Sequence, residues 1–262
     1  MVDFFVNLHP VMQAFFATMM TYFFTALGSA MVFPFKSVNR NVMDAILGMA
    51  GGLMIAASFF SLLNPAIERA KSLGQTAWFI VSLGFLAGGV LLFVTDKIST
   101  MILEKKSGDI YHKRIFMLLF SITMHNIPEG LVVGLAFGSL AHGNTTLGAA
   151  CMLALGIAIQ NFPEGSALSI PMRREGYSRK KAFFLGQVSG WVEPIAGVLG
   201  ALLVLKVQSI LPFALAFAAG AMIYVVVEEI IPESQSNKRK DLMAFFTLIG
   251  FILMMILDVS LG

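Results

Sequence analysis

Residues 115–140 read IFMLLFSITMHNIPEGLVVGLAFGSL, a long apolar run without lysine or arginine. As a helix rising about 1.5 Å per residue, the run is long enough to cross the ~30 Å hydrocarbon core of a bilayer. It nevertheless contains His125, Asn126 and Glu129 near its centre. Ionisable groups are costly at that depth, so those that persist there are candidates for a functional site. The run predicts a transmembrane helix that carries polar chemistry in its middle.

The composition of the whole chain is that of a membrane protein. Of its 262 residues, 57% are hydrophobic and 13% are charged, whereas about 25% are charged in an ordinary soluble domain. The single cysteine, Cys151, excludes an internal disulfide and a thiolate cluster for a soft metal. The net charge of +3 lies in short loops rather than on a continuous basic face, so no nucleic-acid partner is expected. We expect membrane lipid to surround most of this chain.

Apolar runs separated by polar breaks predict eight transmembrane helices and an all-α integral membrane protein. The expected bounds are 11–35, 45–65, 76–96, 115–140, 147–172, 182–205, 209–231 and 242–261. Seven spans, with one glycine-rich run re-entrant, is the alternative. No stretch is left over for a soluble domain, so residues 1–262 are predicted to form a single transmembrane domain.

The basic residues predict how the helices cross the membrane. Alternate loops at 36–40, 97–114, 173–181 and 238–240 hold 15 of the 18 lysines and arginines. Cytoplasmic loops carry an excess of these residues, so the rich side is assigned to the cytoplasm. Both termini then face outward from an inner, cytoplasmic membrane. An odd number of spans would mix the two sets of loops, which favours eight spans over seven.

The central motif occurs twice. Residues 125–130 read HNIPEG in the fourth predicted span, and residues 160–165 read QNFPEG in the fifth. The two spans are adjacent and cross the membrane in opposite directions. Transporters with inverted repeats place such pairs around a site at the membrane midplane. We therefore predict inverted-repeat symmetry around helices 4 and 5, with spans one to three related to spans six to eight.

The spacing within each copy groups side chains that bind metals. Residues four apart share a helix face, so His125 points with Glu129, and Gln160 with Glu164. Each motif asparagine follows on the adjoining face. Imidazole nitrogen with carboxylate and amide oxygen suits zinc, iron(II), manganese and cadmium, whereas copper(I) prefers sulfur. The alternative for a single copy is a kinked structural helix whose glutamate bonds to a neighbour.

Glu193 is a third buried carboxylate, near the middle of the sixth predicted span. A stripe of glycines at helical spacing, Gly186, Gly190, Gly197 and Gly200, permits close packing against another helix. That packing would carry Glu193 inward. The alternative is a glutamate that bonds across a helix interface without touching metal. The candidate metal ligands are thus His125, Asn126, Glu129, Gln160, Asn161, Glu164 and Glu193.

Prolines and a second acidic group complete the pattern. Pro128 and Pro163 each remove a backbone donor and clash with the carbonyl four residues earlier, so a kink and a broken helix are expected at both motifs. Glu228, Glu229 and Glu233 surround Pro232 at the cytoplasmic end of the seventh span. They form either an exit funnel that concentrates cations or a solvated helix end.

These features resemble the ZIP (Zrt- and Irt-like protein) family of divalent metal transporters, and segments 173–181 and 187–200 look most like its prokaryotic branch. The resemblance covers the whole chain and implies a binuclear site on helices 4, 5 and 6. One ion would be held by His125, Glu129, Gln160 and Glu164. A second would be held by Asn126, Asn161 and Glu193, with Glu129 and Glu164 bridging.

The chain departs from many members of that family in two ways. The loop after the third span lacks a histidine-rich stretch, which puts metal sensing through that loop in doubt. Position 161 is asparagine where aspartate is often found. This leaves three carboxylates for two divalent ions, and it puts strong binding of the second ion in doubt.

We expect the protein to transport divalent transition-metal ions into the cytoplasm, with Zn2+ as the expected ion; the sequence does not rank Zn2+ against Cd2+, Fe2+ and Mn2+. The resemblance implies an elevator-like or rocking motion, without a catalytic cofactor and without enzyme activity. A proton-coupled organic cation carrier is one alternative, but aromatic residues would then accompany the carboxylates. An intramembrane metal-dependent hydrolase is another, but it would show His-Glu-x-x-His. The sequence leaves the oligomeric state open, a homodimer included.

Overall fold

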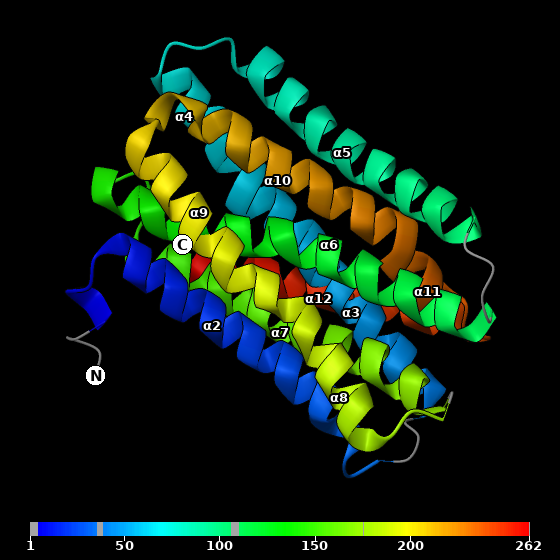
Figure 1. The fold of residues 1–262 in the computed structure, drawn as a ribbon. Coiled ribbons are helices and arrows are strands. Elements are labelled where there is room, and N and C mark those ends of the chain that lie inside the picture. The colour runs from blue at the N-terminus through cyan, green and yellow to red at the C-terminus, as the bar shows by residue number, and fades with distance from the viewer. Residues whose placement is uncertain (1–4, 36–38, 106–109, 175, 262) are drawn as a thin grey trace.

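The computed structural model describes residues 5–35, 39–105, 110–174 and 176–261 (Figure 1). These ranges are almost entirely helical and contain no strand. Short caps fix several helix starts. Asn39 Oδ1 accepts a hydrogen bond of 2.9 Å from the backbone N–H of Asn41, and Ser178 Oγ accepts one from Lys181. Such caps satisfy amide groups that have no partner within the helix.

Eight long helical segments correspond to the eight predicted spans. They are α2 (Pro10–Ser29) with η1 (Ala30–Val32); α3 (Arg40–Ala57), η2 (Ser58–Leu63) and α4 (Asn64–Ser72); α5 (Ala77–Lys105); α6 (Ile110–Ser139) with η3 (Leu140–His142); α7 (Leu147–Arg174); α8 (Arg179–Val188), η4 (Ser189–Trp191) and α9 (Val192–Lys206); η5 (Gln208–Ile210), α10 (Leu211–Val225), η6 (Val226–Ile230) and α11 (Ile231–Gln235); and α12 (Lys240–Leu261). Among the described residues, seven of these segments are long and apolar enough to span a membrane, and α6 is the eighth long helix. The all-α membrane fold is confirmed.

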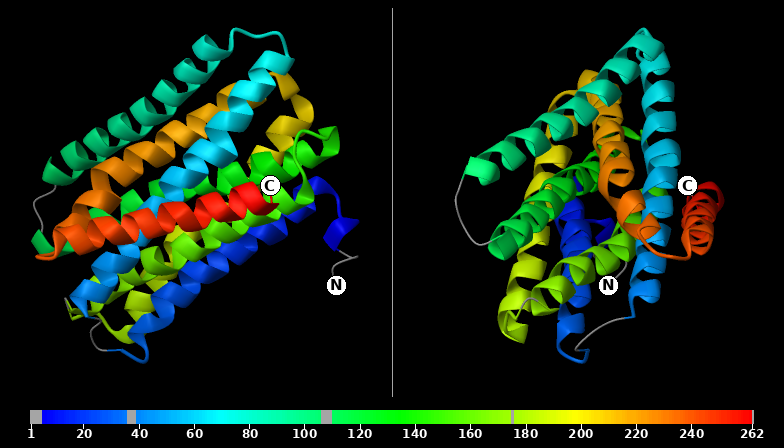
Figure 2. Two further views of the ribbon diagram at one scale, coloured as in Figure 1. Left: turned by 180° about the vertical axis from the view of Figure 1, so that it is seen from behind. Right: turned by 90° about the vertical axis from the view of Figure 1, so that its right-hand side faces the viewer.

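The helices pack as two related sets of pairs. The most extensive contacts join α2 to α7, α6 to α9, α3 to α12, and α5 to α10. Exchanging spans one to three with six to eight, and span four with five, converts the first pair into the second and the third into the fourth. This is the packing that an inverted repeat predicts. The ends of α2 and α12 nearest the two termini lie at the same end of the bundle (Figures 1 and 2).

The second and seventh segments share a local irregularity. Each contains a π-helical turn, η2 or η6, which ends close before a proline, Pro65 or Pro232. Proline lacks a backbone donor and crowds the preceding turn, so the helix widens there instead of continuing regularly. The sixth segment is interrupted by the 3-10 turn η4 just before Glu193 and Pro194, as the position of Pro194 favours. The two π-helical turns therefore recur at corresponding places in the two halves, whereas α2 of the first segment is continuous where the sixth is interrupted.

The broken helices predicted at Pro128 and Pro163 are not observed, because α6 and α7 continue as α-helices through both prolines. Next to each proline, the backbone of a neighbouring helix packs closely against the motif glycine. A Cβ atom added to Gly130 would lie 2.4 Å from the Glu193 carbonyl oxygen, and one added to Gly165 would lie 2.1 Å from that of Thr25. Only glycine permits this approach. Helices α9 and α2 thus press directly against the two motif glycines.

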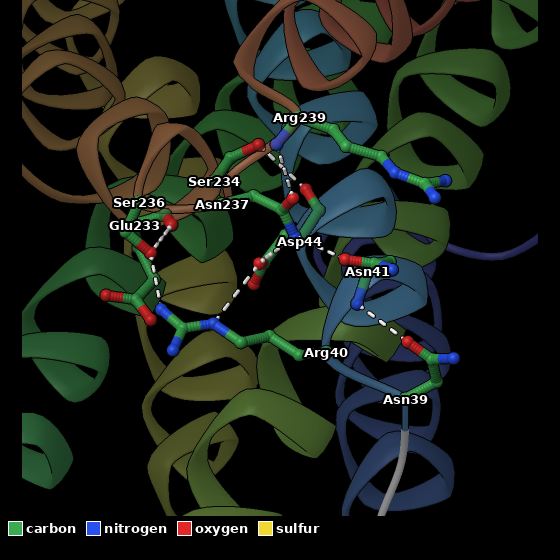
Figure 3. Close-up of polar contacts among 9 residues, drawn as sticks. All are labelled: Asn39, Arg40, Asn41, Asp44, Glu233, Ser234, Ser236, Asn237 and Arg239. Atoms are coloured by element: carbon green, nitrogen blue, oxygen red, sulfur yellow. Dashed lines mark hydrogen bonds and ion pairs between the residues drawn. The ribbon is translucent and has the colours of Figure 1, made fainter.

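The second segment begins at Arg40, five residues before the predicted start, and this buries Asp44. Figure 3 shows the polar cluster that makes burial tolerable. Asn237 Nδ2 donates a 2.7 Å hydrogen bond to Asp44 Oδ2, Arg40 Nε lies 3.5 Å from the same oxygen, and Ser234 donates to the Asp44 carbonyl. Because these partners compensate the buried carboxylate, the helix can begin before Asp44. The cluster joins the start of α3 to the connection between α11 and α12.

Candidate metal centre

The two motifs face each other where α6 and α7 meet inside the bundle. Their polar residues, together with Glu193 of α9, are all buried, and none is more than 7% exposed. The sequence contains no lysine or arginine between residues 115 and 172, so the motif carboxylates have no basic residue on their own helices beside them. Buried charge needs compensation, and a polar cluster of this kind is suited to a cation.

One contact joins the two motifs directly. Gln160 Nε2 donates a 2.5 Å hydrogen bond to Glu129 Oε1. The second oxygen of Glu129, Oε2, and the amide oxygen of Gln160 are buried without a hydrogen-bond partner. The predicted pairing of α6 with α7 at these positions is therefore present, and each residue keeps one free oxygen.

A second contact brings in the sixth span. Asn161 Nδ2 donates a 2.9 Å hydrogen bond to Glu193 Oε2. From α2, Thr21 donates to the same oxygen, and Thr25 Oγ1 lies 3.3 Å from Glu193 Oε1. The glycine stripe of the sixth span packs as expected, with Gly190 beside Tyr22 and Gly197 beside Thr18. Glu193 is consequently fully buried and points toward α7.

The most informative feature is a group of buried oxygen atoms without hydrogen-bond partners. They are Asn126 Oδ1, Glu129 Oε2, Gln160 Oε1, Asn161 Oδ1 and Glu164 Oε1. Roughly 90% or more of buried polar groups in proteins have a partner, so several exceptions on two facing motifs need an explanation. Carboxylate and amide oxygens are donors to divalent cations. The side chains of these residues therefore have the chemistry needed to coordinate a metal ion.

His125 lies beside the seventh segment. Its Nε2 lies 3.4 Å from Glu229 Oε1 of η6. Both residues line an open pocket, together with Asp96 and Tyr224. In the described part of the chain, no three histidine, cysteine, aspartate or glutamate side chains converge closely enough to chelate a metal. The candidate ligand set therefore depends on the amide oxygens as well as on the carboxylates.

Two residues that contact this cluster are not apparent as site residues in the sequence. Thr21 and Thr25 lie in the first span, which the sequence analysis treats only as an apolar run. A signal is present, since Thr18, Thr21, Thr25 and Ser29 recur every three or four residues along α2 and all four are buried. Such a stripe marks one polar helix face, but not what that face contacts.

Comparison with known proteins decides the family. A family model described as "ZIP Zinc transporter" matches residues 110–258, more than half of the chain. The chain belongs to the ZIP family. This ZIP protein is 39% identical to "Zinc transporter ZIP11" of Xenopus tropicalis over 330 aligned positions, which cover 97% of this chain and 98% of the relative. The resemblance identified from the motifs is confirmed.

Bacterial relatives support the same assignment. The ZIP protein is 33% identical to "Zinc transporter GufA" of Myxococcus xanthus, with 91% of this chain and 94% of the relative covered. It is 32% identical to "Zinc transporter ZupT" of Chlorobaculum parvum, with 96% and 98% covered. These relatives are transporters, and the ZIP protein is accordingly a multi-pass metal transporter rather than an enzyme.

Proposed function

We propose that this ZIP protein carries Zn2+ across the cytoplasmic membrane into the cytoplasm, through a two-ion site on α6, α7 and α9. The observation that carries the proposal is the set of buried oxygens without partners on the two motifs. In a region surrounded by lipid, such atoms are costly unless a ligand satisfies them. A transported cation supplies that ligand.

The chemistry of the donors favours zinc. The set combines one imidazole, His125, with carboxylates and amide oxygens, and it contains no sulfur. Zinc accepts nitrogen and oxygen ligands, whereas copper(I) selects thiolate or thioether. The three relatives described above are all named zinc transporters. Cd2+, Fe2+ and Mn2+ are the competing ions for the same donors.

The contacts suggest how the ligands divide between two ions. Glu129 and Gln160 touch each other, and the family resemblance adds Glu164 and His125 to them in the first position. Asn161 and Glu193 touch each other and form the second position with Asn126. The family resemblance implies that Glu129 and Glu164 would bridge the two positions.

Two observations support inward transport. The loops at 36–40, 97–114, 173–181 and 238–240 carry 15 of the 18 basic residues, and these loops are therefore assigned to the cytoplasm. The pocket between His125 and Glu229 also contains Thr95 and Asp96, which lie toward the end of α5 that this topology places inside. An ion released from His125 would thus meet carboxylates on its way to the cytoplasm.

The packing is compatible with alternating access. Helices α2, α6, α7, α8 and α9 contact one another extensively and carry the candidate ligands, whereas α3, α5, α10 and α12 form the remaining close pairs (Figure 2). Contacts between the two groups include α3 with α7 and α6 with α10. We propose that the first group moves relative to the second and exposes the site to each side in turn.

The test is radioactive zinc uptake into vesicles that contain purified protein, with orientation determined by protease cleavage. Wild type should accumulate zinc in the outside-to-cytoplasm direction, and cadmium, iron(II) and manganese should compete to measurable extents. Glu129→Ala should lose most uptake at an unchanged protein level. Glu68→Ala removes an exposed glutamate on α4 and is the matched control. Near-normal uptake by Glu129→Ala, or competition by an organic cation alone, would overturn the proposal.

A further inference from the structure

We propose that Thr21 of α2 is a positioning residue that fixes Glu193 and, through it, Asn161 as ligands of the second metal position. The inference rests on the two-ion site of the proposed function and adds the first transmembrane helix to it. It is drawn from two hydrogen bonds to one oxygen atom, because Thr21 and Asn161 both donate to Glu193 Oε2. These hydrogen bonds join three helices, α2, α9 and α7.

The number of hydrogen bonds that each carboxylate oxygen accepts shows how these contacts hold Glu193. Each carboxylate oxygen accepts about two hydrogen bonds. Oε2 receives two, from Thr21 and from Asn161, and is therefore saturated. Oε1 receives only the 3.3 Å contact from Thr25 and keeps a free lone pair. The carboxylate is thus held through one oxygen and can offer the other to an ion.

The same contacts determine which atom Asn161 offers. Its Nδ2 donates to Glu193 Oε2 at 2.9 Å and lies 3.4 Å from the Thr21 carbonyl oxygen. Both neighbours are acceptors, so the amide nitrogen must face them. Asn161 Oδ1 then points the other way, buried and without a partner. An amide at position 161 needs this arrangement to act as an oxygen ligand, because a flipped amide would present N–H groups to the ion.

The Thr21 hydroxyl has a second acceptor within reach. The carbonyl oxygen of Thr18 lies 2.9 Å from Thr21 Oγ1, and one hydroxyl proton cannot serve both. Glu193 must be ionised to act as a metal ligand, and an ionised acceptor forms the stronger bond, so the carboxylate then receives the proton. Thr18 itself is the matched comparison. It is equally buried on the same helix face, but its hydroxyl donates to the carbonyls of Ala14 and Phe15 in its own helix rather than to a carboxylate.

The experiment titrates purified protein with zinc, or with cadmium as a spectroscopic probe, and resolves the first and second binding steps. The variants are Thr21→Val, Thr21→Ser and Thr18→Val. Thr21→Val keeps the side-chain volume and removes the hydroxyl, so it should weaken the second step about tenfold or more and leave the first step unchanged. Thr21→Ser keeps the hydroxyl and should restore second-step affinity. Thr18→Val should resemble wild type.

The outcomes separate this inference from the function on which it rests. If wild type binds one ion, or if Glu193→Ala leaves two binding steps intact, the two-ion site is wrong. If wild type binds two ions through Glu193 but Thr21→Val matches wild type, the positioning role is wrong. If Thr21→Ser is impaired and Thr21→Val is not, the methyl group matters and Thr21 acts only by packing.

Discussion

Asn161 offers the sharpest test of how the metal centre is built, because Asn161→Asp changes one nitrogen to oxygen. In the structure that nitrogen lies 2.9 Å from Glu193 Oε2 and donates to it. The substitution replaces an attractive contact with two carboxylates side by side. At this separation and an effective dielectric of about 20, the repulsion between two unit charges is about 5.7 kcal/mol.

A divalent ion bound between the two carboxylates reverses this penalty. If only a quarter of the repulsion, about 1.4 kcal/mol, appears as binding energy, the second ion binds about tenfold more tightly. The protein without metal should be less stable than wild type. Tighter binding need not mean faster transport, because an ion must also leave. We expect a lower KM for zinc uptake with an equal or reduced maximal rate.

The assay is metal titration of purified wild type and variant, combined with thermal unfolding with and without zinc and with uptake kinetics. A matched control exists at the end of the bundle that the proposed topology places in the cytoplasm. Asn237 Nδ2 donates a 2.7 Å hydrogen bond to Asp44 Oδ2 (Figure 3). Asn237→Asp therefore creates a similar carboxylate pair away from the candidate ligands. The control should lose stability without gaining zinc affinity. If Asn161→Asp behaves in the same way, Asn161 does not face the metal and the second position is refuted.

Three further predictions follow from the site and the fold. His125→Ala should lose most zinc uptake, because no other imidazole is among the candidate ligands, whereas His142→Ala of η3 should retain it; equal uptake by both variants would contradict the first metal position. In a Cys151→Ser background, a cysteine at Val6 should react with an impermeant reagent from outside and one at Lys180 should not; the opposite labelling would reverse the topology assigned from the basic loops. Gly165→Ala should lower the free energy of unfolding by about 1–3 kcal/mol and so reduce the unfolding temperature in thermal unfolding assays. The reason is that its Cβ would lie 2.1 Å from the Thr25 carbonyl oxygen. Gly89→Ala is the control for that substitution, because its nearest neighbour lies at 3.6 Å, and equal effects would show that α2 does not press on α7 at this point.

The comparison of sequence and structure shows which properties are local. Apolar runs long enough to cross a bilayer predict all eight segments, because lipid forces each span to satisfy its own backbone hydrogen bonds. The second segment begins five residues before the predicted start near Ala45, because Asp44 is buried among polar partners. A charged residue ends a span unless it finds partners, and the partners of Asp44 come from residues 234 and 237, far away in sequence.

The sequence by itself determined the membrane class, the repeated motif and the seven polar residues that the fold then buries. Residue type and helical spacing specify these properties, since residues four apart share a face in any helix. Only the tertiary structure decided that Glu193 is held by Thr21 and Asn161, that His125 lies beside Glu229, and that α6 and α7 continue through their prolines. These outcomes depend on which helices pack together and how closely. Close contacts such as that of Gly130 with Glu193 form between segments that are distant along the chain, where no local pattern specifies the partner.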